Sequence, residues 1–467
     1  MFDPTLPALK RALTHAADHL ESLETAPVMA PLSVGELRQR LTVPLADAGL
    51  PAEQVIDDLV AATMGGQNGS AGGRFFGWVI GSALPSALAA DWLTSAWDNN
   101  SGIYACAPAA SVVEEVAANW LIDLLELPRD AGVGFVTGCQ LAHVTALAAA
   151  RHALLAQRGW DVEAKGLYGA PPIRVIVNED RHATIDRAVR FLGMGQDSLH
   201  VLPLASDARL APQTLAAALA ESDQPTIVVL QAGDLNLGVF DDFEALIPLA
   251  GAAGAWTHID GAFGLWAKVS PAKRPLIGGV ELADSWATDG HKWLNVPYDS
   301  GLVFVRDAEA LKGAMTQYAS YVSPEGDARD AIAFGPEFSR RGRGYAIYAA
   351  LRELGRTGLA DLIDRTCGHC HAMATRIGAL PDATLIAEPS LNQAIVRFHD
   401  RRAEATEADH DARTQAVINA VNASGESLFS GAVWRGRRVM RISVCSWRTT
   451  AADIDRAVTA VAQALAA

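Results

Sequence analysis

Basic residues and cysteines are both scarce in this sequence of 467 residues. Lysine and arginine total 38 against 53 aspartates and glutamates, which gives a formal net charge of -15 at pH 7. An acidic chain is poorly suited to bind a phosphate backbone or an anionic lipid surface, so we expect neither nucleic acid nor a membrane as a partner. The five cysteines are too few and too scattered for a disulfide framework, and we expect reduced thiols.

Long apolar runs are also missing. No stretch approaches the ~18 uninterrupted apolar residues that a membrane-spanning helix needs. Residues 1–20 carry charges and prolines where a secretory signal would place its hydrophobic region, which favours a cytoplasmic protein. Apolar side chains still make up 50% of the chain and charged ones 19%, so the composition is that of a globular protein with a large core.

One cysteine pair matches a known haem-attachment pattern. Cys367 and Cys370, followed by His371, fit C-x-x-C-H, in which two thiols capture the haem and the histidine is an axial ligand. The pair lies in a strongly helical segment, and no export signal is recognisable, so we interpret both cysteines as ordinary helix residues. Zinc is also disfavoured because no second ligand pair stands at a finger-like spacing, and we expect no metal.

The pattern of apolar residues divides the chain into three parts. Residues 1–74 predict an N-terminal helical segment without a core of its own, ending in a flexible glycine-rich connector at residues 64–74. Residues 75–344 alternate helices with short β-branched runs, which predicts a large α/β domain with a mostly parallel sheet. Residues 345–467 predict a small C-terminal α+β domain. We expect strands at residues 134–137, 173–178, 226–231, 255–260, 301–305, 383–387, 394–398 and 439–445.

Two charged residues follow predicted strands in the large domain. Asp260 ends the strand expected at residues 255–260, and Lys292 lies in the later segment Asp289-Gly-His291-Lys292-Trp. Open α/β sheets bind ligands at the carboxyl ends of their strands. A lysine in an apolar loop and a carboxylate at a strand end are what a pyridoxal phosphate enzyme requires, because the lysine forms the Schiff base and the acid keeps the pyridine nitrogen protonated. Either residue alone would more simply be a helix cap or a solvated charge.

Several further segments accompany these two residues in a fixed order. They are Phe75-Phe-Gly-Trp78, Leu88-Ala-Ala-Asp91, Ser111-Val-Val-Glu-Glu115, the region of Thr137, His182, His258-Ile-Asp260, His291-Lys292-Trp293, Pro336-Glu-Phe-Ser-Arg340-Arg341 and Arg441-Ile-Ser-Val-Cys-Ser-Trp-Arg-Thr-Thr450. With them, nearly the whole chain resembles the group II pyridoxal-dependent decarboxylases, the family of aromatic-L-amino-acid decarboxylase, and especially the bacterial members. The resemblance implies a fold-type I (aspartate-aminotransferase-like) α/β protein with pyridoxal 5'-phosphate as cofactor.

The resemblance assigns roles around the cofactor ring. Lys292 would carry the cofactor and Asp260 would meet its ring nitrogen. His182 would stack on the ring face opposite Ala262, although a lone histidine is more often a loop residue. His291 would support the phosphate or the lysine loop, with a simple hydrogen-bonding partner as the alternative, and Asp289 would join the cofactor site.

The phosphate is expected at a helix start, where unpaired N–H groups and the helix dipole favour an anion. The residues Thr137, Gly138, Cys139 and Gln140 precede or open a predicted helix at residues 141–158. A second loop with Asp234 and Asn236 matches the family segment that approaches phosphate and substrate. The chain departs from the family at three positions. Gln140 stands where the family usually has a small hydroxyl residue, His143 stands where it often has an Asn, and Leu237 stands where a Thr is common. These departures concern side-chain contacts more than the site itself, because backbone amides do much of the phosphate binding.

Tyr321 matches the family's mobile-loop tyrosine, which protonates the substrate carbon after carbon dioxide leaves. A surface or packing tyrosine is the alternative, because Tyr318 lies close by in the sequence. In relatives that form aldehydes oxidatively, this tyrosine or the stacking histidine is typically replaced. Both Tyr321 and His182 are present, which favours simple decarboxylation to an amine and carbon dioxide.

The substrate is expected to be an aromatic L-amino acid of the tryptophan, tyrosine or phenylalanine type. Phe75, Phe76 and Trp78 follow the N-terminal segment where family members line the side-chain pocket, although aromatic residues are also ordinary core. Arg341 and Arg441 are candidate partners for the substrate carboxylate or the phosphate, with surface salt bridges as the alternative.

Family resemblance also implies a homodimer with its active sites at the interface and the N-terminal helices wrapped over the partner. Two other functions stay open. One is another pyridoxal phosphate reaction on the same scaffold, such as oxidative deamination, aldehyde synthesis, aldol cleavage or decarboxylation of an acidic amino acid. The other is a regulatory protein that binds pyridoxal phosphate with weak catalysis, suggested by the departures at Gln140, His143 and Leu237.

Overall fold

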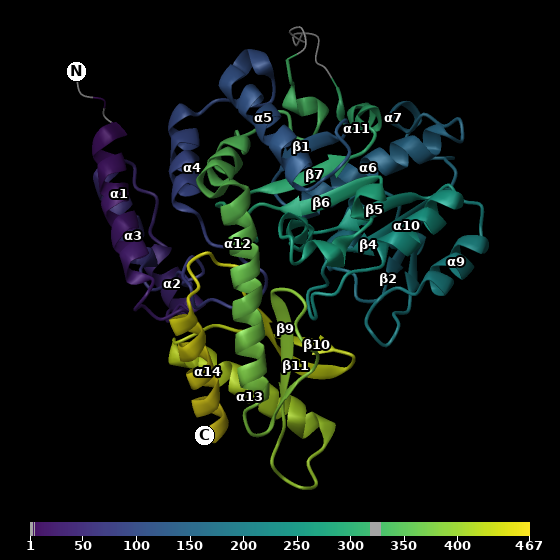
Figure 1. The fold of residues 1–467 in the computed structure, drawn as a ribbon. Helices are drawn as coiled ribbons and strands as arrows, with labels where there is room; N and C mark the ends of the chain where they lie inside the picture. Colours follow the sequence, from purple (N-terminus) through teal and green to yellow (C-terminus); the bar gives the residue numbers. More distant parts are fainter. Residues whose placement is uncertain (1–2, 4, 318–327) are drawn as a thin grey trace. The chain divides into compact units, whose positions relative to one another are not determined.

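The computed structural model describes residues 3, 5–317 and 328–467. Contacts group the chain into two compact units that each draw on distant parts of the sequence (Figure 1). The first unit comprises residues 1–80, 369–388 and 394–467, and the second comprises residues 81–368 and 389–393. The division at residues 74 and 344 stays a prediction.

The second unit is built on a sheet of seven strands in the order β1-β7-β6-β5-β4-β2-β3. β7 runs antiparallel to its neighbours β1 and β6, whereas all the other pairs are parallel, so the expected mostly parallel sheet is confirmed. The strands are β1 (Gly132–Val136), β2 (Arg174–Asn178), β3 (Leu199–Leu202), β4 (Thr226–Gln231), β5 (Trp256–Asp260), β6 (Ser285–Asp289) and β7 (Gly301–Val305).

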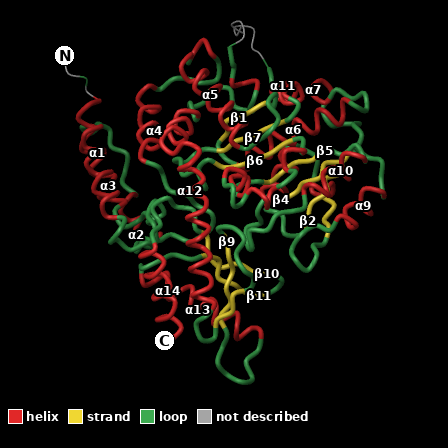
Figure 2. The backbone as a smooth tube through the Cα atoms, viewed as in Figure 1, coloured by secondary structure: helices red, strands yellow, loops and turns green. Residues whose placement is uncertain are grey.

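Helices flank this sheet (Figure 2). α6 lies across β1, β5, β6 and β7, and its many small residues, such as Ala146, Ala149 and Ala150, let its backbone approach the β-branched strand residues closely. The helices of the unit are α4 (Pro85–Trp97), α5 (Pro108–Leu124), α6 (Cys139–Ala156), α7 (Val162–Lys165), α8 (Ala183–Phe191), α9 (Pro212–Ala220), α10 (Phe243–Ala252), α11 (Ala308–Met315) and the first part of α12 (Gly344–Gly378).

Strand register brings several polar residues to one edge of the sheet. Asp260 lies opposite Gln231 of β4 and Ala287 of β6, and Asp289 lies opposite Gly301 of β7. Gly301 in turn lies opposite Val136, the last residue of β1. The ends of β5 and β6 and the start of α6 therefore share this edge, which is where a doubly wound sheet binds its ligand.

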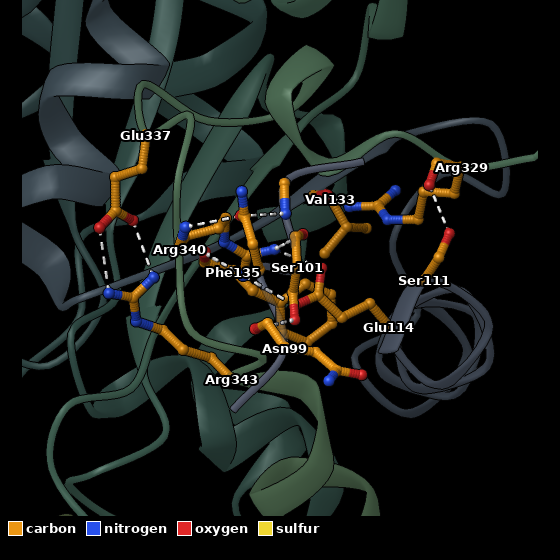
Figure 3. A network of polar contacts seen from close by, with 12 residues as sticks. Asn99, Ser101, Ser111, Glu114, Val133, Phe135, Arg329, Glu337, Arg340 and Arg343 are labelled. Atoms are coloured by element: carbon orange, nitrogen blue, oxygen red, sulfur yellow. Dashed lines mark hydrogen bonds and ion pairs between the residues drawn. The ribbon is translucent and has the colours of Figure 1, made fainter. Parts of the chain in front are cut away.

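The outer edge of β1 is covered by a network of arginines (Figure 3). Arg340 forms two hydrogen bonds of 2.7 and 2.9 Å with the Glu114 carboxylate and also donates to the carbonyl of Phe135. Arg329 donates to the carbonyl of Val133, and its carbonyl accepts from Ser111. The guanidinium groups thus satisfy edge carbonyls that would otherwise be open to pairing with another strand.

The Glu114–Arg340 pair yields a stability prediction. Both side chains are almost completely buried, so the Glu114→Gln substitution leaves a buried guanidinium without its counter-charge. We expect the free energy of unfolding to fall by about 3 kcal/mol, measured by urea denaturation. Glu115→Gln, at the exposed neighbouring position, is the matched control and should change stability little. Equal losses in the free energy of unfolding for the two substitutions would show that the buried ion pair does not contribute more to stability than an exposed carboxylate.

The first unit contains the N-terminal helices and the C-terminal part of the chain. Its antiparallel sheet has the order β10-β11-β9-β8, with strands β8 (Ala383–Leu385), β9 (Gln393–Phe398), β10 (Ser430–Trp434) and β11 (Arg437–Ser443). The helices are α1 (Thr5–Ser22), α2 (Val34–Leu41), α3 (Ala52–Thr63), α13 (Glu407–Ser424), α14 (Ala451–Ala466) and the end of α12. Phe76, Phe398, Val417 and Ile442 belong to its core.

The glycine-rich stretch is not a flexible connector, and this expectation was wrong. Arg74 at its end is buried and donates hydrogen bonds to the carbonyls of Leu23, Glu24, Ala26, Gly425 and Glu426. The nearby Gly69 donates to the Val28 carbonyl. The glycines allow this close backbone approach, and the arginine then joins the N-terminal and C-terminal segments of the unit.

The predicted helical environment of the C-x-x-C-H segment is confirmed, since Cys367 and Cys370 lie within α12 and are buried. His371 pairs with Glu388 at 3.2 Å. Throughout the part of the chain that the structure describes, no group of three or more His, Cys, Asp and Glu side chains is arranged to hold a metal ion. No helix among these residues has the length and hydropathy needed to cross a membrane.

Candidate active site

Lys292 and Asp289 form an ion pair at the ligand-binding edge of the sheet. The Lys292 Nζ lies 3.0 Å from Asp289 Oδ2, and Asp289 is buried at the end of β6. Burial alone would lower the pKa of the Lys292 amine, but the Asp289 carboxylate raises it above its ordinary value. Burial alone would raise the pKa of Asp289, which Lys292 and His291 instead lower. The pair therefore holds the amine in a fixed place on the sheet edge.

The start of α6 lies beside this pair. Cys139, the first residue of α6, donates its backbone N–H to Asp289 Oδ1 at 2.7 Å. A Cβ on Gly301 would lie 2.3 Å from the Gly138 Cα, so only glycine allows β7 and α6 to meet here. Burial raises the pKa of the Cys139 thiol well above its ordinary value, which keeps it neutral. The site thus combines an amine with the positive end of a long helix.

His291 supports the lysine loop. Its Nδ1 accepts the backbone N–H of Ser300 at 3.1 Å, so the ring proton lies on Nε2, which is 3.5 Å from Asp289 Oδ1. The imidazole also stacks on Tyr298, with ring centroids 4.2 Å apart. Burial lowers the pKa of His291 although Asp289 opposes this, so the ring positions the loop without adding a charge.

Asp260 presents a carboxylate from the next strand. It is 7% exposed, and its Oδ1 accepts the backbone N–H of Ala262 at 3.3 Å. Burial would raise the pKa of Asp260, but His143, His182 and Lys292 together lower it below its ordinary value. The carboxylate is therefore ionised at neutral pH and available to a cationic group on a ligand.

The starts of α6 and α8 are tied together. Gln140 Nε2 donates to the Thr184 carbonyl at 3.2 Å, which gives the departure from the family at Gln140 a structural role. His182 is the N-cap of α8, and its Nδ1 accepts the Thr184 N–H at 3.3 Å. The His182 side chain is exposed, and it is among the groups that lower the pKa of Asp260 electrostatically.

The loop after β4 is folded around Asp234. The Asp234 carboxylate accepts the backbone N–H groups of Asn236, Leu237 and Val239, so it shapes its own loop. The base of the loop is held by Asp241, which accepts the N–H groups of Gln231 and Leu210 at 2.8 and 3.0 Å.

Asp241 yields a prediction about pH. Burial raises its pKa from 3.8 to about 6. Because the folded-state value lies above the unfolded one, the folded protein favours the protonated acid, and stability falls as pH rises between these values. We expect wild type to lose about 2 kcal/mol between pH 4 and pH 7 relative to Asp241→Asn, which lacks this titration. Urea denaturation at both pH values measures the difference, and parallel pH profiles would contradict it.

The other predicted site residues occupy varied places. In the second unit, Thr137 is half-buried directly after β1, the Ala262 carbonyl accepts the Asp289 N–H at 2.9 Å, and Arg341 pairs with Asp91 of α4 at 2.7 Å. Four predicted residues belong to the first unit: Phe75, Phe76, Trp78 and Arg441. Phe76 stacks on Phe429 in the core there, whereas Trp78 is exposed. Tyr321 lies outside the described residues.

Two residues that the sequence did not single out shape the lysine loop. A Cβ on Gly81 would lie 1.8 Å from the Lys292 carbonyl oxygen. Asn295 is fully buried with a φ of +56°, and its side chain accepts from the Ser82 N–H and donates to the Trp293 carbonyl. The local sequence gives no signal for either role, because Gly81 and Lys292 are more than 200 positions apart, as are Ser82 and Asn295.

Comparison with known proteins identifies the family. A family model described as "Pyridoxal-dependent decarboxylase conserved domain" matches residues 35–399. The chain belongs to this family. The decarboxylase is 27% identical over 463 residues to tryptophan decarboxylase 1 of Oryza sativa subsp. japonica, covering 94% of this chain and 89% of that protein. It is 28% identical over 389 residues to L-2,4-diaminobutyrate decarboxylase of Rhizobium meliloti (strain 1021), covering 82% of this chain and 75% of the relative.

The fold comparison agrees. The crystal structure of Oryza sativa TDC with PLP and tryptamine matches the decarboxylase with a TM-score of 0.92 at 23% identity, covering 100% of this chain and 99% of that one. The predicted group II family and fold-type I architecture are confirmed. The protein is a carboxy-lyase whose cofactor is pyridoxal 5'-phosphate.

The residues of the decarboxylase fit this cofactor. A partly buried amine, an ionised carboxylate on the neighbouring strand and the amino end of α6 match an aldehyde, a ring nitrogen and a phosphate in chemical type. Buried polar atoms without a hydrogen-bond partner in the described chain include Gln140 Oε1, His143 Nε2, Asn236 Oδ1 and Ser300 Oγ. Unpaired buried polar atoms are costly in a closed core, so they are typical of a site that binds a polar ligand.

Proposed function

We propose that this decarboxylase converts an aromatic L-amino acid to its amine and carbon dioxide, with Lys292 as the residue that binds the cofactor covalently. The observation that carries the site assignment is the placement of the Lys292 amine against Asp289, with ionised Asp260 on the neighbouring strand. Bound pyridoxal phosphate supplies a ring that accepts the negative charge left on the substrate carbon when carbon dioxide departs.

The chain's own residues prepare this chemistry. Asp260 holds a proton on the ring nitrogen, because a buried carboxylate with a lowered pKa stabilises a cation beside it. The start of α6 holds the phosphate through its N–H groups and dipole. Asp289 keeps the Lys292 amine in position, and the Cys139 N–H fixes Asp289.

Three further roles complete the proposal. His182 would stack over the ring face opposite Ala262. Tyr321 returns a proton to the substrate carbon after decarboxylation. Asp234 and Asn236 form the wall of the phosphate and substrate site, through a loop that the Asp234 carboxylate holds in shape.

Aromatic specificity is the finer part of the proposal. It is supported by the similarity to the rice protein named tryptophan decarboxylase over 94% of this chain. The relative from Rhizobium meliloti is named for a diamino acid, so substrate class varies among relatives at comparable identity.

An amino-acid panel tests this function. The purified protein, loaded with pyridoxal phosphate, is given tryptophan, tyrosine, phenylalanine, glutamate, aspartate and 2,4-diaminobutyrate, and carbon dioxide and amine are quantified. We expect one or more aromatic substrates to be preferred. Preference for an acidic or diamino substrate would overturn the aromatic assignment, and ammonia, peroxide or glycine as product would overturn decarboxylation as the reaction.

We also propose a cytoplasmic homodimer. Among the described residues of α1, α2 and α3 none is buried, and Leu6, Leu9, Leu13, Val55 and Leu59 are large exposed apolar side chains. Apolar faces of this kind are typical of subunit interfaces. Light scattering at micromolar concentration should give a dimer mass, and an active monomer would contradict the proposal. The five cysteines are few and scattered along the sequence, which is consistent with a reducing compartment.

A further inference from the structure

A chain of four buried side chains lies behind Asp260. Trp256 Nε1 is 2.9 Å from Ser285 Oγ, Ser285 Oγ is 2.9 Å from His258 Nδ1, and His258 Nε2 is 2.9 Å from His143 Nδ1. The chain ends with His143 Nε2, 3.7 Å from Asp260 Oδ1. We call Trp256, Ser285, His258 and His143 the His143 relay. It crosses β5, β6 and α6 and is buried along its whole length.

Hydrogen-bond chemistry gives the relay one favoured direction. An indole nitrogen only donates, so Trp256 donates to Ser285 Oγ. The Ser285 hydroxyl then donates to His258 Nδ1, His258 donates from Nε2 to His143 Nδ1, and the proton of His143 lies on Nε2. The opposite direction would aim a lone pair of His143 at the Asp260 carboxylate, which is repulsive. The favoured direction instead presents an N–H to a group that only accepts.

Both imidazoles are neutral. Burial lowers the pKa of His258 to about 3, and burial lowers that of His143 although Asp260 and Asp289 oppose the shift. The other titratable groups that act on both His143 and Asp260 are His182 and Lys292. A neutral donor stabilises a carboxylate without placing a second cation beside the cofactor ring.

We propose that the His143 relay fixes the tautomer of His143, so that its Nε2–H keeps Asp260 ionised and oriented toward the cofactor ring nitrogen. His143 is then a positioning residue that acts through Asp260, and Ser285 sets its direction from a second strand. This role rests on the proposed function of Asp260. It also explains His143 Nε2, a buried atom with no hydrogen-bond partner in the described chain, which a small movement of Asp260 would pair.

The test compares Ser285→Ala, which removes the donor to His258, with His143→Phe, which removes the last link. Thr145→Val is the matched control, since Thr145 is a buried hydroxyl on the same helix as His143 and, among the residues that the structure describes, it donates to the Leu141 carbonyl alone. Each holoprotein is titrated with pH while the visible band of its bound cofactor is followed, and the dissociation constant of pyridoxal phosphate is measured.

We expect Ser285→Ala and His143→Phe to weaken cofactor binding about tenfold. The pH at which the visible band is half converted should rise by about one unit, which is a tenfold change in proton affinity. The reason is that a ring nitrogen that holds its proton less firmly withdraws less charge from the Lys292 nitrogen. Thr145→Val should change neither quantity. If Ser285→Ala behaves like Thr145→Val, the relay has only a structural role and the proposal is overturned.

The same titration separates this proposal from the proposed function. A wild-type protein without a visible cofactor band would contradict the role of Lys292 and, with it, the relay. A wild-type protein with the band and unchanged variants would contradict the relay alone. If His143→Phe disturbs folding, Ser285→Ala keeps the test decisive because it removes a single hydroxyl oxygen.

Discussion

Substitution of Lys292 with Ala should reduce decarboxylation on the order of 10⁴-fold, the largest effect that we predict. The substitution removes the amine that we propose binds the cofactor, and it leaves Asp289 without its cation 3.0 Å away. Initial rates of carbon dioxide release from the preferred amino acid measure the effect. The isolated variant should also lack the visible band of bound cofactor.

The matched control is Lys312→Ala on α11, whose side chain is exposed and pairs with Glu309. Its rate and spectrum should equal those of wild type. A Lys292→Ala protein that is folded by circular dichroism and keeps more than about a tenth of wild-type activity would disprove the assignment of this lysine.

Asp260→Asn should lower the rate on the order of 10³-fold. The amide keeps the shape of the carboxylate but carries no charge, so it cannot stabilise a proton on the ring nitrogen, and the ring accepts negative charge less well. Lys292 is unaltered, so the variant should still bind the cofactor. Loss of rate with retained cofactor absorbance is the expected combination.

Asp242→Asn is the control for this substitution. Asp242 is the N-cap of α10, where asparagine is an equally good cap, so the rate should not change. An Asp260→Asn variant within about threefold of the wild-type rate would show that the ring nitrogen does not depend on this carboxylate.

The large sheet was predictable in part. The strands expected at residues 226–231 and 301–305 coincide with β4 and β7, because both are short apolar runs with clear boundaries. β6 was missed, although it positions Asp289. Its sequence Ser-Trp-Ala-Thr-Asp has three polar residues in five, and yet all five are buried. Ser285 is accommodated there because Trp256 and His258 bond to its hydroxyl, and these partners are invisible in the local sequence.

The site was predictable where it depends on strand ends. Asp260 could be named because it ends an apolar run, and both Asp260 and Lys292 lie in segments that resemble family motifs. The pairing of His143 with His258 could not, since it joins residues 115 positions apart in the sequence. For the glycine-rich stretch at residues 64–74 the expectation from the sequence was wrong. Its composition suggested a flexible connector, whereas the buried Arg74 anchors it through tertiary hydrogen bonds.

The most direct measurement is to locate the cofactor on the chain. The protein is incubated with pyridoxal phosphate, reduced with borohydride, digested and analysed by mass spectrometry. The account predicts one modified peptide, with the pyridoxyl phosphate mass on Lys292 and none on Lys268, Lys273 or Lys312. Modification of another lysine in a catalytically active protein, with Lys292 unmodified, would contradict it.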